Sequence, residues 1–107
     1  MPIIRIDYDD KVVQNTEIQL LSKQIQSIVA KHTKIKEVFV YANTAEIKLN
    51  IDPIEIFIEM SAKINDDFPN LMQDIKNDLK EWKLKHNFST PINLTIIPMQ
   101  WQIEIAI

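Results

Sequence analysis

Pro2, the second residue of the chain, is the residue with the most distinctive potential chemistry. Removal of Met1, which is usual before a small residue such as proline, would leave Pro2 with a free secondary amine. An unperturbed α-amino group has a pKa of ~7.7–8.0, and burial or a nearby cation lowers that pKa by disfavouring the ammonium form. Such an amine can take a proton from one atom and return it to another. The ordinary alternative is that Pro2 merely begins a strand, where its missing N–H is tolerated.

Arg5 is the only arginine, so it is the only side chain in one chain that could form a bidentate carboxylate clamp. It could also polarise a carbonyl oxygen. The alternative is an ion pair with Asp7, Glu55 or Glu59. Trp101 lies near the C-terminus after a proline, where its ring could wall a pocket or seal an interface.

The remaining candidates favour structural roles. His32 and His86 fall near the ends of predicted helices, where they suit the helix dipole, and two histidines far apart do not argue for a metal site. The chain has no cysteine, which excludes disulfides, thiolate metal sites and a cysteine nucleophile. It has no glycine, which removes glycine-rich phosphate and dinucleotide loops and leaves the turns to Asn, Asp and Pro. We therefore expect neither a metal nor a cofactor.

Charge and length limit the kinds of partner, the number of domains and the location that we expect for the chain. The net charge of −3 argues against nucleic acid and anionic membranes, which attract a basic face. The first twenty residues contain four acids and do not resemble a signal peptide, and the apolar runs are too short to span a membrane. The 107 residues fit one domain, which we expect to be cytoplasmic.

Hydrophobic periodicity predicts the elements that position these residues. Alternation favours strands at residues 2–8, 38–41, 44–51, 54–60 and 92–97, and a short C-terminal strand at 101–107. Apolar residues that recur three and four positions apart favour helices at 16–33 and 67–86. Thr16 and Gln19 have the spacing of a capping box, and Pro69 suits the first turn of the second helix.

The pattern repeats along the chain. Pro2 and Pro53 stand 51 residues apart, as do the two proposed caps, Thr16 and Asp67. The sequence therefore predicts an α+β domain of two β-α-β halves, about residues 1–51 and 52–107. Right-handed crossovers would place both helices on one face of a four-stranded mixed sheet. The other face, expected to be rich in Ile and Val, should be covered by another subunit.

A tandem β-α-β chain that begins with Met-Pro resembles the tautomerase superfamily. That group includes 4-oxalocrotonate tautomerase, 5-carboxymethyl-2-hydroxymuconate isomerase and macrophage migration inhibitory factor. The start Met1-Pro2-Ile3-Ile4-Arg5 and the late segment Ile97-Pro98-Met99-Gln100 resemble a bacterial branch of it. The chain departs from the family in lacking its usual glycines and in its tail. The basic residue that often follows the first strand has Lys11 as its nearest counterpart.

The resemblance implies keto–enol isomerisation of a small enol or 2-oxo acid. Pro2 would be the general base, and Arg5, Lys11 and Trp101 would bind the carboxylate substrate. It also implies a homotrimer. The alternative is a non-catalytic ferredoxin-like module that binds a small ligand or a protein. A free Pro2 amine with a low pKa distinguishes the two.

Overall fold

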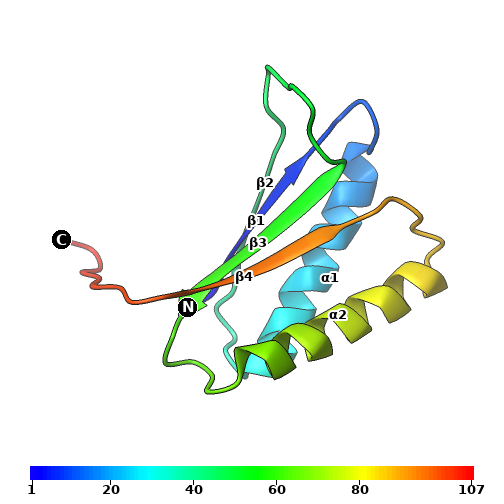
Figure 1. Cartoon of the computed structure of the whole chain (residues 1–107). Coiled ribbons are helices and arrows are strands. Elements are labelled where there is room, and N and C mark those ends of the chain that lie inside the picture. Colours follow the sequence, from blue (N-terminus) through cyan, green and yellow to red (C-terminus); the bar gives the residue numbers. More distant parts are fainter.

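The computed structural model describes all 107 residues. Its elements are, in order, β1 (Ile3–Tyr8), α1 (Asn15–Thr33), β2 (Phe39–Asn43), β3 (Ile54–Ser61), α2 (Phe68–Lys85) and β4 (Asn93–Met99). Both helices cover the same face of one twisted sheet (Figure 1). The predicted α+β fold with two β-α-β units is therefore confirmed.

The sheet has the strand order β2-β1-β3-β4. β1 and β2 are parallel, β3 and β4 are parallel, and β1 and β3 pair antiparallel in the centre. The two β-α-β units thus lie side by side in opposite directions, as expected from the repeat. The division after residue 51 falls in the loop between β2 and β3, and that division stays a prediction.

Local sequence explains where the helices begin and end. At α2, the Asp67 side chain accepts a hydrogen bond from the Asn70 backbone N–H at 3.1 Å, so the predicted cap is confirmed. At α1 the predicted cap at Thr16 is wrong, because the helix begins at Asn15 and its N-cap is Gln14, two residues before Thr16. Glu17 accepts from the Gln14 N–H at 3.2 Å and so satisfies one of the exposed donors.

The lack of glycine shows at the C-terminus of α1. Lys34 ends the helix with a left-handed φ of 60°, and its N–H donates to the Ala30 carbonyl. Asn50 and Asn87 take two further positive-φ positions, which agrees with the expected use of Asn in turns. Non-glycine residues therefore adopt conformations that glycine usually supplies.

The core lies between the helices and the sheet. The predicted apolar stripe of α1 is buried throughout, and four residues of the α2 stripe are buried with it. The sheet contributes alternate residues, namely Ile4 and Ile6 from β1 and Ile54, Ile56, Ile58 and Met60 from β3. This one-sided burial is what the alternating sequence predicts. Neither helix combines the length and apolar character that a membrane span requires.

The predicted strand at residues 44–51 is wrong, because this segment is an irregular loop. β2 is an edge strand whose pairing with β1 ends at Asn43, so no strand is available beside the next residues. Lys48 instead contacts Asp9 and Asp10 of the turn after β1. Ile47 and Leu49 are left 82% and 85% exposed. Alternation describes one side of a strand, whereas a strand also needs a partner.

The last strand continues through Pro98, whereas the sequence predicted that it would end at residue 97. Pro98 lies within β4, opposite Met60. An edge strand tolerates the missing N–H of proline. Residues 100–107 extend away from the sheet without regular structure (Figure 1). The short strand predicted at 101–107 is therefore not formed in the single chain, where it has no partner. We predict that this segment pairs with a neighbouring subunit.

The helix-free face of the sheet is less aliphatic than expected. The strand registers place on it Ile3, Arg5, Asp7, Phe39, Tyr41, Asn43, Glu55, Phe57, Glu59, Ser61, Asn93, Thr95, Ile97 and Met99. The face contains no valine, because Val40, the only valine in the strands, pairs with Ile4 and packs against the core on the other side. It is a mixed surface with charges near its centre and apolar side chains around them.

Candidate active site

Pro2 is buried at the start of β1. Its carbonyl oxygen accepts a hydrogen bond from the Phe39 N–H at 3.1 Å, which links the beginnings of β1 and β2. The registers pair Ile3 with Glu59 and Ser61 with Met99, so β3 and β4 end where β1 begins. We call this side of the sheet, formed by the ends of the strands and not by an edge strand, the Pro2 edge. Figure 1 shows the N-terminus at this edge, from which the C-terminal tail also leaves. Pro2 therefore lies where four strand termini meet.

Arg5 lies on the helix-free face and is already engaged within the chain. Its Nε lies 3.3 Å from the Asp7 carboxylate and one terminal nitrogen lies 3.5 Å from Glu59. The guanidinium also lies 4.7 Å from the centroid of the Phe57 ring, a cation–π distance. Two of the three expected acidic partners are thus present. The third, Glu55, instead accepts from the Asn93 amide at 2.9 Å.

The structure separates Lys11 from Pro2. Lys11 lies in the exposed turn after β1, whereas Pro2 precedes this strand. Six residues of strand span roughly 20 Å, at about 3.3 Å per residue. Within one chain, Lys11 therefore lies at the edge of the sheet opposite Pro2, and it cannot contact a substrate held there.

Trp101 is closer to Pro2 in the fold. It follows β4, whose C-terminal end lies at the Pro2 edge, two strands away from β1. Two strand spacings amount to roughly 10 Å. Its side chain is partly buried although the tail after it is exposed. The structure thus brings Pro2 and Trp101 to one edge and places Arg5 on the adjoining face.

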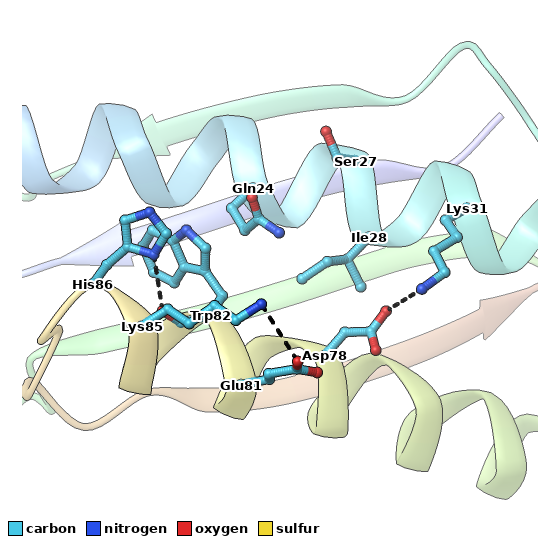
Figure 2. A pocket seen from close by; sticks show the side chains of 9 residues that line it. All are labelled: Gln24, Ser27, Ile28, Lys31, Asp78, Glu81, Trp82, Lys85 and His86. Carbon is cyan, nitrogen blue, oxygen red and sulfur yellow. Dashed lines mark hydrogen bonds and ion pairs between the residues drawn. The ribbon is translucent and has the colours of Figure 1, made fainter.

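A groove between α1 and α2 is lined by five ionisable side chains, namely Lys31, Asp78, Glu81, Lys85 and His86 (Figure 2). Its volume is about 370 Å³. Lys31 pairs with Asp78 at 3.1 Å, and Lys85 pairs with Glu81 at 3.5 Å. The charges in this groove thus neutralise one another, and the pair of Lys31 with Asp78 joins the two helices.

Both histidines make structural contacts at this groove, as expected for residues at helix ends. His32 Nε2 lies 2.7 Å from Asp78 Oδ2. This hydrogen bond lowers the pKa of Asp78, the hydrogen bond from Lys31 lowers it less, and together they outweigh the opposite effect of burial. His86 Nδ1 lies 3.1 Å from the Trp82 carbonyl oxygen, and its ring stacks on Trp82 with 5.2 Å between centroids. No group of three or more His, Asp or Glu side chains is arranged to hold a metal ion.

A hollow of about 690 Å³ lies on the helix-free face beside the loop between β2 and β3. Asp7, Asp52 and Glu55 line it, and no cation does. This hollow would repel a carboxylate in the single chain.

Sequence reasoning missed the contact between Arg5 and the Phe57 ring. The alternation of β3 placed Glu55, Phe57 and Glu59 on one face, but it could not say which of them lies beside Arg5. The antiparallel register pairs Arg5 directly with Phe57 and diagonally with Glu59. That information is held in the pairing of the two strands, so no local pattern reveals it.

No protein-family model matches the sequence, and no curated protein matches it significantly. Solved structures do resemble it. A malonate semialdehyde decarboxylase inhibited by 3-bromopropiolate superposes with a TM-score of 0.66 at 12% identity, covering 96% of this chain and 89% of that one.

Two further solved structures are of proteins named above as members of the tautomerase superfamily, which the sequence resembles. A 5-carboxymethyl-2-hydroxymuconate delta-isomerase has a TM-score of 0.61 at 9% identity and covers 99% of this chain and 89% of its own. Macrophage migration inhibitory factor from Oncomelania hupensis has a TM-score of 0.59 at 16% identity and covers 92% and 73%. At such low identities the likeness concerns the fold. The chain has the fold of the tautomerase superfamily.

Proposed function

We propose that this chain is a tautomerase-like enzyme that interconverts the keto and enol forms of a small enol or 2-oxo acid. The observation that carries the proposal is the position of Pro2. It is buried at the start of β1, at the edge where four strand termini meet, in a fold shared with isomerases. Once Met1 is removed, Pro2 has a secondary amine at that position.

Burial disfavours an ammonium group, so the surroundings of Pro2 favour the neutral amine that a general base requires. The amine removes a proton from the substrate hydroxyl or carbon and returns it to the other atom. The substrate carboxylate needs a cation close by. Within one chain Arg5 is engaged by Asp7 and Glu59, and Lys11 lies at the far edge.

A homotrimer supplies what the single chain lacks. Three sheets arranged around one axis bury the mixed helix-free face and bring the Arg5 or Lys11 of one subunit toward the Pro2 of another. Trp101 follows β4 at the Pro2 edge and forms one wall of the site, where its ring excludes water. We accordingly propose Pro2 as the base and Arg5, Lys11 and Trp101 as substrate-binding residues.

The alternative function is a ferredoxin-like module that binds a small ligand or a protein without catalysis. The engagement of Arg5 with Asp7 and Glu59 favours it, because the only guanidinium of the single chain is then already paired within the chain. The alternative requires no free amine at Pro2.

The test is ketonisation of phenylenolpyruvate by untagged protein, with removal of Met1 verified by mass spectrometry. Pro2→Ala keeps a primary amine and should lose activity toward the lower end of the ~10²–10⁴-fold range typical of a general base. An N-terminal tag should abolish the reaction. Pro91→Ala, an exposed loop proline, is the matched control. Equal rates for wild-type, tagged and Pro2→Ala proteins would exclude Pro2 as the base. The absence of any rate above buffer with several enol acids would favour the alternative.

A further inference from the structure

Three lysines of α2 form a stripe that no acid neutralises. Lys76, Lys80 and Lys83 are spaced four and three residues apart, so they lie on one side of the helix. None of them forms an ion pair, whereas nearby Lys85 pairs with Glu81. An unpaired cationic stripe in a chain of net charge −3 is a local departure from the overall charge.

Two adjoining hollows run along this lysine stripe. One, of about 620 Å³, is formed by the end of α2 and the following loop. The other, of about 420 Å³, lies between α2 and the start of β4. Lys80 and Lys83 line both hollows, and no carboxylate lines either. Figure 1 shows the end of α2 turning back through this loop to β4.

The floor of the hollows is apolar. Phe88 and Leu79 are 8% and 5% exposed, Ile92 and Leu94 are partly buried, and Leu84 lies exposed at the rim. Lys83 Nζ donates to the Thr90 carbonyl at 2.7 Å and lies 5.8 Å from the centroid of the Phe88 ring. Charge and apolar surface thus occur together, as in small-molecule sites, whose volumes are roughly 300–1,000 Å³.

We propose that these hollows bind a small amphipathic carboxylate, with its anionic group against the lysine stripe and its apolar chain along Phe88 and Leu79. Burial lowers the pKa of Lys83, since its ammonium has lost part of its hydration. A bound carboxylate would compensate for that loss. Asp52 and Glu55 accept hydrogen bonds from the amide of Asn93, which lines the second hollow.

This site is distinct from Pro2. The start of β4 pairs with the start of β3, at the edge of the sheet opposite the Pro2 edge. Binding here therefore does not depend on the proposed tautomerase activity, and Pro2→Ala should leave it unchanged.

The test is a titration of the full chain with decanoate, followed by chemical shifts of backbone amides and by calorimetry. The largest shifts should fall in the second half of α2 and in residues 87–94. Lys76→Gln combined with Lys80→Gln should weaken binding roughly tenfold or more, because two cations that face the anion are lost. Both residues are exposed and their side chains form no ion pair or hydrogen bond, so the fold should persist.

The matched control combines Lys23→Gln with Lys63→Gln, which removes the same charge from exposed sites elsewhere and should leave the affinity unchanged. Decanol tests the apolar contribution alone and should bind at least several-fold more weakly. Equal weakening by both double variants, equal binding of decanol, or shifts confined to other elements would overturn the proposal. So would a change of oligomeric state in the Lys76, Lys80 variant, which would identify the hollows as a subunit interface.

Discussion

Replacing three isoleucines of the C-terminal tail by serine should weaken assembly of the chain into the proposed homotrimer. Ile103, Ile105 and Ile107 alternate along the tail and are 60%, 71% and 106% exposed in the single chain. None of them belongs to the core cluster. If the tail pairs with a neighbouring subunit, as an exposed apolar strand is prone to do, these side chains become buried only in the assembly.

The magnitude follows from the burial that each side chain would gain. Complete burial of one isoleucine stabilises by about 1.5–3 kcal/mol. The lower value is appropriate here, because the tail also loses conformational freedom when it docks. Three residues then contribute about 4 kcal/mol for each docked tail. Since 1.4 kcal/mol corresponds to tenfold in an equilibrium constant, the dissociation constant should rise about 10³-fold.

Sedimentation velocity across a range of micromolar concentrations measures this effect. The wild type should sediment as a trimer and the triple variant increasingly as a monomer, with unchanged circular dichroism because the core is untouched. Leu20→Ser is the matched control, since Leu20 is 57% exposed on α1, away from the sheet face. A wild type that stays monomeric, or a triple variant that assembles as tightly, would refute the reasoning.

Two further predictions concern stability. Asp78→Asn should lower the free energy of unfolding by about 1 kcal/mol at pH 7, because the ionised carboxylate loses its hydrogen bond from His32. The folded pKa of Asp78 is lowered, so its contribution is present above the ordinary carboxyl value of about 3.9 and is lost as the pH falls through the folded value. Urea denaturation at pH 7 and near pH 2.5 should show the difference from wild type shrinking in acid, and a constant difference would contradict the assignment. Lys34→Gly should raise stability by about 0.5–1 kcal/mol, since glycine adopts the left-handed φ of 60° without a Cβ clash. Thermal and urea unfolding should show no such gain for Lys36→Gly, whose backbone lacks a positive φ.

The helices and the two central strands could be predicted closely from the sequence. The apolar stripe from Ile18 to Val29 and the alternation of Ile54 to Met60 each describe burial on one side of a single element. Such patterns are local, because they depend only on how a helix or strand repeats along its own axis. The interval between Pro2 and Pro53 likewise indicated two units, and that arrangement is present in the sheet.

The same patterns gave wrong predictions where the formation of a strand depends on a neighbouring strand. Residues 44–51 alternate as regularly as a true strand, yet they lie beyond the end of the pairing between β2 and β1. Pro98 was expected to stop a strand, but the edge position of β4 tolerates it. Alternation identifies a residue's side of a strand, whereas only neighbouring backbone provides hydrogen-bond partners.

For the candidate sites, the sequence by itself determined that Pro2 begins a strand, that Arg5 is the sole arginine, and that two helices cover one face of a sheet. Only the tertiary structure decided that Arg5 lies against Glu59 and Phe57, and that Lys11 lies at the edge opposite Pro2. It also decided that the unpaired lysines of α2 lie beside β4. The physical reason is that periodicity acts within an element, whereas contacts between elements depend on strand register, strand direction and the path of the connecting loops.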